Sequence, residues 1–165
     1  MQLIQVDEQI LAVLVKSTRD GLSMAGIKPI PIGVNKYFQC KRAVSAIVGF
    51  VGPTSGSVVV NMSEECACMM AGRLLGEETK ELSTQTVDGV CEIANIIAGQ
   101  TKAMLSSTEH KFDRISIPSI VVGTSYFIRN YRGMKSITVE FEIPDQDNSL
   151  RADLSFTVSM CMMKI

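Results

Sequence analysis

The chain of 165 residues has no tryptophan, a single histidine and almost no excess of charge of either sign. Sixteen Lys and Arg are balanced by seventeen Asp and Glu, so the formal net charge is -1. No basic run gathers on any segment to neutralise the phosphates of a nucleic acid. The one histidine, His110, has no neighbouring ligands for a tetrahedral metal site. These absences argue against a nucleic-acid partner and against a metal held by this chain.

The sequence also lacks the roughly 20 uninterrupted apolar residues that a membrane span requires. Residues 1–15 contain a short apolar run, but Asp7 and Glu8 stand where a signal peptide carries positive charge. We interpret this segment as an amphipathic helix and expect a soluble, cytoplasmic protein with no membrane partner. The five cysteines are odd in number and form no CxxC pair, so we expect buried free thiols in a reducing compartment.

What the chain does contain is enough apolar sequence, 46 %, for one sizeable core. Its length is too short for two ordinary domains, so we expect residues 1–165 to form a single domain. Apolar and polar residues alternate along 136–143 and again along 150–160, which predicts a long antiparallel hairpin around a turn at 144–149. Residues 43–52 and 56–62 predict an earlier hairpin that is apolar on both faces and therefore covered on both.

Helices are predicted between and before these hairpins. Ser63 is a suitable cap for a helix that runs to about Leu75 and ends at Gly76, and a second helix covers about 84–107. The apolar stretch around Pro118 predicts an edge strand or crossover that leads to another strand near 126–131. The order helix, proline, strand, hairpin occurs twice, so the expected fold is an α/β (α+β) layer of two pseudo-twofold halves. Its long helices pack on an antiparallel-rich sheet.

The helix expected at 84–107 has two distinct faces. Its apolar positions gather on one side, which we assign to the core; they are Val87, Val90, Ala94, Ile97, Thr101, Met104 and Leu105. Spacings of three and four residues place a polar set on one narrow stripe of the opposite side, and this stripe consists of Asp88, Glu92, Asn95, Gly99 and Lys102.

The plain interpretation of this stripe is the solvated face of an amphipathic helix. Asn95 and Gly99 argue for more, because Asn is a mediocre helix former and Gly costs about 1 kcal/mol relative to Ala in a helix interior. Residues that are locally unfavourable tend to mark contact surfaces. A glycine one turn beyond Asn95 would let another protein approach the helix backbone closely.

Four positions of this region resemble a known signature. Asp88, Glu92, Asn95 and Pro118 match the pattern Asp or Ser, three residues, Glu, two residues, Asn, twenty-two residues, Pro. This is the signature of the CheC, CheX and FliY family of bacterial chemotaxis phosphatases, and the chain is similar to the CheX-like members over most of its length beyond about Ala43. CheX-like members carry the signature once. If Pro31 is matched to Pro118, Gln5 and Glu8 take the positions of Glu92 and Asn95, so the pair is not repeated.

The resemblance implies a CheC-like fold and an enzyme that removes the phosphate from the aspartyl phosphate of a CheY-like response regulator. Asn95 would hold the attacking water in line, as a glutamine does in GTP hydrolysis. Glu92 would pair with the lysine of the receiver's active site. Gly99 and Asp88 would belong to the contact surface, although Asp88 has the alternative role of favouring the positive end of its own helix. Pro118 is structural.

The resemblance further implies that no cofactor binds this chain, since Mg²⁺ is expected on the phosphorylated receiver. It also implies a homodimer, for which we expect subunits to meet through sheet extension at the 43–62 hairpin. Two other functions stay open: a non-catalytic module that docks on a receiver domain, and an assembly protein of the motor-switch kind. Turnover of a phosphorylated receiver separates the enzyme from both.

Overall fold

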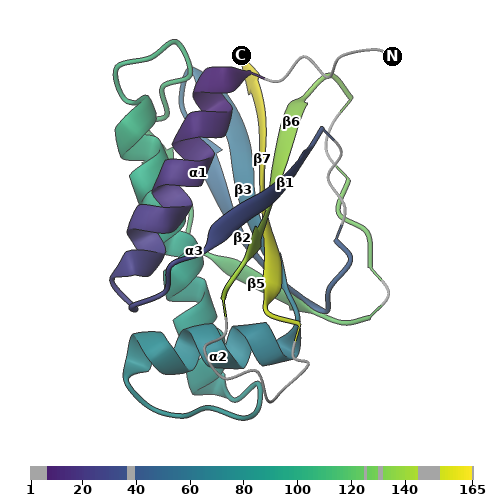
Figure 1. The fold of residues 1–165 in the computed structure, drawn as a ribbon. Coiled ribbons are helices and arrows are strands. Elements are labelled where there is room, and N and C mark those ends of the chain that lie inside the picture. The colour runs from purple at the N-terminus through teal and green to yellow at the C-terminus, as the bar shows by residue number, and fades with distance from the viewer. Residues whose placement is uncertain (1–6, 37–39, 125, 130–131, 145–152, 165) are drawn as a thin grey trace.

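The computed structural model describes residues 7–36, 40–124, 126–129, 132–144 and 153–164 (Figure 1). In these ranges α1 (Glu8–Ser23) and α3 (Thr84–Leu105) lie on one side of an antiparallel sheet, and α2 (Glu64–Leu75) packs against α3 across the lower end of the molecule. The strands are β1 (Ile30–Asn35), β2 (Val44–Val51), β3 (Thr54–Met62), β4 (Arg114–Ile115), β5 (Ser119–Val122), β6 (Lys135–Glu142) and β7 (Ser155–Lys164). The predicted α+β class is therefore confirmed.

The sheet has the two-fold pattern that the repeated element order predicts. Its strands run in the order β1-β6-β7-β3-β2-β4, and β5 also pairs with β2. The hairpins β2–β3 and β6–β7 meet in the centre, where Val59 lies opposite Ser159. A twofold axis through this pair exchanges β3 with β7, β2 with β6 and β1 with β5. The two halves of the chain thus contribute equivalent parts to one continuous sheet.

Each helix begins at a side-chain cap, which explains its first residue. Asp7 accepts a hydrogen bond from the Ile10 amide at 3.2 Å, and Ser63 accepts one from the Cys66 amide at 3.1 Å. Such caps satisfy amide groups that have no partner inside the helix. Gly76 ends α2, as predicted, with a positive φ of 74° that glycine adopts without strain.

The core lies between the helices and the inner face of the sheet. The inward residues of β6 and β7 that alternation predicts, among them Val139, Phe141 and Phe156, are fully buried. The rings of Phe141 and Phe156 stack with their centroids 5.2 Å apart. Leu154, one residue before β7, is half-buried; the predicted continuation at 150 and 152 and the turn at 145–149 lie outside the described residues.

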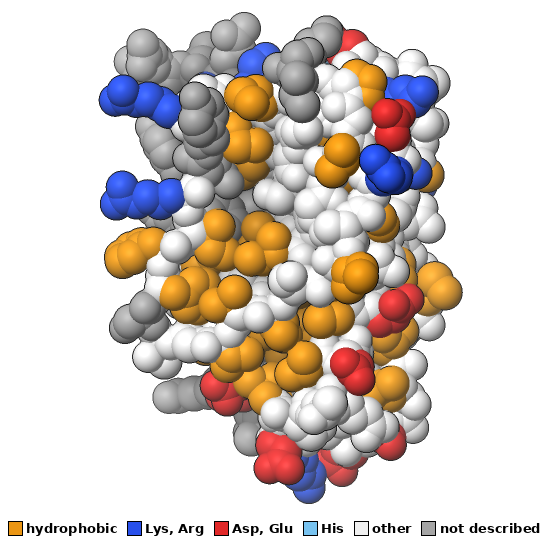
Figure 2. Space-filling view, turned by 180° about the vertical axis from the view of Figure 1, so that it is seen from behind, with side chains coloured by type: hydrophobic (Ala, Val, Ile, Leu, Met, Phe, Trp, Pro, Cys, Tyr) orange, Lys and Arg blue, Asp and Glu red, His pale blue; other side chains and the backbone are white. Residues whose placement is uncertain are grey.

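The outer face of the central hairpin is covered only in part. Val59 and Asn61 are buried, at 2 % and 0 % exposure, whereas Val51 at the other end of the hairpin is 51 % exposed. The prediction that both faces of this hairpin are covered therefore holds fully only for the face that packs against the helices. Figure 2, seen from behind, shows apolar side chains exposed across the middle of the molecule and acidic ones toward the end where Figure 1 places α2.

Two predictions about strands are wrong. Residues 126–129 form no strand. Here the Tyr126 side chain contacts the sheet instead: its hydroxyl donates to the Arg42 carbonyl at 3.2 Å and lies 2.8 Å from Ser45 Oγ. Residues 130 and 131 lie outside the described part. The 43–62 hairpin also offers no free edge for sheet extension, since β2 pairs with β3, β4 and β5, while β3 pairs with β2 and β7.

Candidate functional site

Helix α3 is held on three sides, and this leaves only a narrow strip of its surface open. It packs against α1 and α2 and lies over β2, β4 and β5 (Figure 1). The buried residues of α3 accordingly extend beyond the predicted apolar side and include Gly89, Ile93 and Ala98. Val87 and Met104, which the periodicity assigns to the core, are only half-buried. The strip that remains open is the polar stripe of the sequence prediction.

The structure places the predicted pair one turn apart on this strip. Glu92 is exposed and Asn95 is half-buried. Within the part of the chain that the structure describes, neither side chain has a hydrogen bond or an ion pair. A carboxylate and a carboxamide with unused hydrogen-bonding capacity therefore project side by side from a rigid helix. Such a pair can bind a cation with one group and both donate to and accept from a water molecule with the other.

Asp88 and Gly99 extend the strip on either side of the pair. Asp88 is exposed and lies in the second turn of α3, because the helix begins at Thr84 and its first turn contains no acidic residue. The stabilising effect of a helix dipole falls off within the first turn, so this position weakens the alternative role of Asp88. At Gly99 an added Cβ would meet no atom within 4 Å, so the space above the helix backbone is open there.

Close packing beneath the strip fixes the position of α3, and the sequence prediction missed it. A Cβ added to Gly89 would lie 2.9 Å from the Cβ of Ala71, so glycine lets α2 approach α3. On the other flank, the Thr101 hydroxyl lies 2.8 Å from Ser17 Oγ of α1 and 2.8 Å from the Ile97 carbonyl oxygen. A glycine directly after Asp88 was a visible signal of such an approach, whereas nothing in the sequence pairs Ser17 with Thr101.

The other groups near the strip do not suggest covalent or metal chemistry. Cys91 is half-buried beside Asp88, and burial together with the Asp88 carboxylate raises the pKa of its thiol. A raised pKa disfavours the thiolate, which is the nucleophilic form. Among the described residues, no three His, Cys, Asp or Glu side chains gather in a group that could hold a metal ion. No helix in the described ranges is both long and apolar enough to cross a membrane.

The equivalent helix α1 does not repeat the pair, although the predicted correspondence was wrong. The hydroxyls of Ser17 and Thr101 meet across the twofold axis, so these two positions correspond. Counting along the helices from them, Glu8 corresponds to Glu92, and Leu11 to Asn95. By the same count Pro118 corresponds to Val34 and not to Pro31. The carboxylate thus recurs, but an apolar side chain replaces the amide.

Comparison with known proteins identifies the family. The model of a family described as "Chemotaxis phosphatase CheX" matches residues 44–142, which is more than half of the chain and includes the open strip of α3. This chain belongs to the CheX family. No curated protein matches it.

Solved structures agree in fold over nearly the whole length. The chemotaxis protein CheX from Desulfovibrio desulfuricans is 30% identical, with a TM-score of 0.78 over 93% of this chain and 99% of that one. The CheX of Borrelia burgdorferi, in a complex with CheY, BeF3 and Mg²⁺, is 27% identical, with a TM-score of 0.71 over 97% and 99%. FliY of Thermotoga maritima shares the fold at 19% identity, with a TM-score of 0.65 over 95% and 91%.

Proposed function

We propose that this CheX-family chain hydrolyses the aspartyl phosphate of a CheY-like receiver domain through Asn95 and Glu92. The observation that carries the proposal is the pair itself, which lies one turn apart on the open strip of α3 without partners among the described residues. The complex of a similar CheX with CheY supports a receiver as the partner. The chain acts as an enzyme in this proposal, and the cytoplasm, where response regulators work, is its expected location.

The chemistry requires little from this chain. Water forms a new P–O bond as the bond to the aspartate oxygen breaks, which yields orthophosphate and the aspartate carboxylate, and the water's proton passes to solvent. The Asn95 amide accepts a hydrogen bond from this water and donates one to a phosphoryl oxygen, so the water is held in line. Glu92 pairs with the receiver's lysine and fixes the register of the helix. Mg²⁺ belongs to the receiver.

Phosphate release from a Mg²⁺-loaded phosphoreceiver tests these roles. We expect wild type to accelerate release and Asn95→Ala to bind the receiver while turning over about 100-fold more slowly, because the water loses its position. Glu92→Ala should instead weaken binding by about tenfold or more. Gln100→Ala is the matched control, since it removes an amide from another side of the same helix and should change neither quantity.

The alternative is a module that docks on a receiver without hydrolysis. Wild type that binds the phosphoreceiver but leaves its lifetime unchanged would establish this module and end the enzyme proposal. Wild type that neither binds nor accelerates release would favour the assembly function. Equal activity of wild type and Asn95→Ala would remove the water-positioning role.

We also propose that the chain forms a homodimer, now through β1 rather than the central hairpin. In the described sheet β1 pairs on one side only, and Ile30, Ile32 and Val34 are 51 %, 52 % and 43 % exposed. An exposed apolar edge strand is a template for another strand. Light scattering should show a dimer for wild type and a monomer for Ile32→Glu. A monomeric wild type at micromolar concentration would disprove the dimer.

A further inference from the structure

A small pocket lies on the face of the sheet opposite the helices, away from α3. Its volume is about 160 Å³, and it is lined by the end of β1, by residues 41 and 42, and by outward side chains of β6 and β7. The outward side chains are Thr138, Glu140 and Thr157, which alternate with the core residues of the two strands. Nothing in the proposed phosphatase role uses this pocket.

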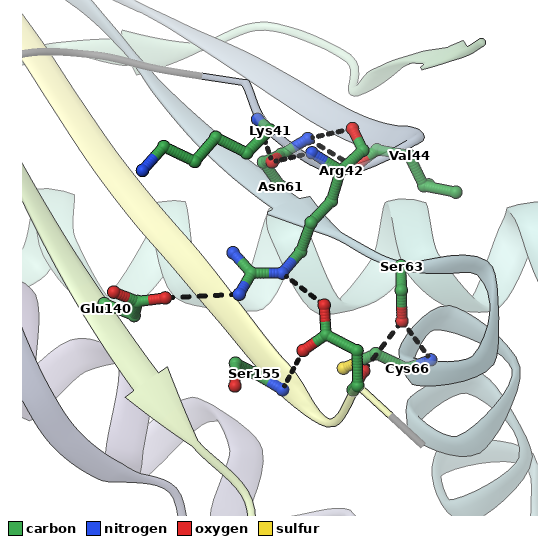
Figure 3. A network of polar contacts seen from close by, with 9 residues as sticks. Lys41, Arg42, Val44, Asn61, Ser63, Cys66, Glu140 and Ser155 are labelled. Carbon is green, nitrogen blue, oxygen red and sulfur yellow. Dashed lines mark hydrogen bonds and ion pairs between the residues drawn. The ribbon is translucent and has the colours of Figure 1, made fainter. Parts of the chain in front are cut away.

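A buried asparagine holds the backbone of two cationic residues at the pocket. Asn61 Oδ1 accepts hydrogen bonds from the backbone amides of Lys41 at 3.2 Å and of Arg42 at 3.0 Å. The Arg42 guanidinium then lies between two carboxylates, with Nε 2.9 Å from Asp153 and Nη2 3.2 Å from Glu140 (Figure 3). The position of the Arg42 guanidinium is therefore set by the fold before any ligand binds, as is the backbone from which Lys41 extends.

Donors without acceptors converge on this pocket. The Lys41 ammonium has no ion pair within the described residues, and Figure 3 shows it extending over the same side of Arg42 as Glu140. Nη1 of Arg42 likewise has no partner there. Thr157 is only 9 % exposed, and its Oγ1 is buried without any hydrogen bond in the described part of the chain. A buried polar atom that lacks a partner costs free energy, so such atoms are rare and call for an explanation.

The charges around the pocket also favour an anion. Among the described lining residues Lys41 and Arg42 are positive and Glu140 alone is negative, while Arg42 also pairs with Asp153 beside the pocket. Lysine and arginine donate short, charge-assisted hydrogen bonds to carboxylate and phosphate oxygens. A hydroxyl can add a further donor at the pocket floor.

We propose that this pocket binds a small oxyanion, either phosphate or a carboxylate, through Lys41, Arg42 and Thr157. The ligand's oxygens supply acceptors for the Lys41 ammonium, for Nη1 of Arg42 and for the Thr157 hydroxyl. The pocket and the open strip of α3 lie on opposite faces of the sheet, so the proposal does not depend on the phosphatase function.

The test is a titration of the full chain with orthophosphate, and separately with acetate, at constant ionic strength, followed by amide NMR shifts. We expect saturable shifts at the pocket amides for at least one of the two anions. Lys41→Ala should weaken binding about tenfold or more, because a charge-assisted hydrogen bond is lost. Thr157→Val should also weaken binding severalfold, yet leave the thermal stability of the free protein unchanged or higher, because the hydroxyl has no partner to lose.

Lys80→Ala is the control, since the Lys80 side chain is 80 % exposed in the loop between α2 and α3. Unchanged binding in this variant, with losses in both pocket variants, supports the site, and the anion that binds more tightly identifies the ligand class. Absence of saturable shifts with either anion overturns the proposal. A loss of anion affinity that is confined to Lys41→Ala, or that is equally large in Lys80→Ala, also overturns the proposal, because the anion would then be attracted only to surface charge.

Discussion

Asn61 holds the start of β2 in place from a fully buried position on β3. Besides accepting from two backbone amides, its Nδ2 donates to the carbonyls of Arg42 at 2.7 Å and Val44 at 3.0 Å. One side chain therefore satisfies four backbone groups of the segment that leads into β2. Because it bonds to neighbouring backbone and contacts no part of the open strip, its role is structural.

We predict that Asn61→Ala lowers the free energy of unfolding by about 3 kcal/mol. The truncation leaves several backbone donors and acceptors without partners, and each such buried group costs roughly 1–3 kcal/mol unless water reaches it. Urea denaturation measures the loss, and Ser57→Ala, a half-buried change on the same strand, should cost less than about 1 kcal/mol. Equal losses for the two variants would mean that the asparagine network contributes no special stability.

Asn95 shows how much a single residue type can reveal from the sequence alone. A poor helix former on the polar side of a strongly amphipathic helix, at a fixed spacing from Glu92, indicated contact rather than stability. That inference used local propensity and helix geometry only, so it needed no tertiary contact. The buried Asn61 gave no such signal, because its partners lie about twenty residues away along the chain.

At the scale of the element, α3 contains two glycines with opposite surroundings. Gly89 touches Ala71 of α2, whereas Gly99 faces open space. The same residue type thus serves two purposes on one helix: close helix packing near its start, and an unobstructed backbone one turn beyond Asn95.

We predict that Gly→Ala has opposite effects at these two positions. Gly99→Ala should raise the free energy of unfolding by roughly 0.5–1 kcal/mol, because alanine is the better helix former and meets no obstacle. Gly89→Ala gains the same propensity but places its Cβ 2.9 Å from that of Ala71, so we expect a net loss of about 1 kcal/mol from overpacking.

Chemical denaturation of both variants under one set of conditions decides the sign, and each serves as the other's control. A stabilised Gly89→Ala would show that α2 moves aside at little cost. Activity of Gly99→Ala on the phosphoreceiver then reports separately whether a methyl group at this point obstructs the partner.

Alternation of apolar residues was sufficient to locate the strands of the second hairpin, because a strand with one buried face repeats every second residue. The first hairpin is apolar on both faces, so it was located by its two apolar runs and the turn between them. Residues 126–129, predicted as part of the strand that follows the apolar stretch around Pro118, form no strand. There a single side-chain contact, from Tyr126 to the segment before β2, takes the place of a backbone ladder. Composition alone does not distinguish these two ways of covering a sheet.

At the scale of the whole molecule, Arg42 links the two pseudo-symmetric halves. It belongs to the first half, while Glu140 and Asp153 belong to the second. Burial acts to raise the pKa of Asp153, but hydrogen bonds from Arg42 and from the Ser155 amide outweigh it, so the pKa lies below its usual value. The ionised carboxylate is therefore favoured by folding.

We predict that this link makes stability fall in acid. A carboxyl group whose pKa is lower in the folded state stabilises the fold fully at pH values above its pKa in the unfolded chain, about 3.9. This stabilisation is lost as the pH falls through the pKa of the folded state. Wild type should therefore lose stability below about pH 4. Asp153→Asn should be less stable than wild type at neutral pH and should show a smaller loss between neutral and acid pH in urea titrations. Parallel curves for the two proteins would remove Asp153 from the acid response.

The sequence by itself determined the helices, the two hairpins and the candidate residues of the site, because helix periodicity, strand periodicity and capping depend on neighbours along the chain. It also determined the stripe of Asp88, Glu92, Asn95 and Gly99, since side chains three or four residues apart must share one side of a helix. Only the tertiary structure decided which hairpin edges are free, which positions of the two halves correspond, and how Lys41, Arg42 and Thr157 meet. These depend on strand order and on contacts between distant segments, which no local pattern encodes.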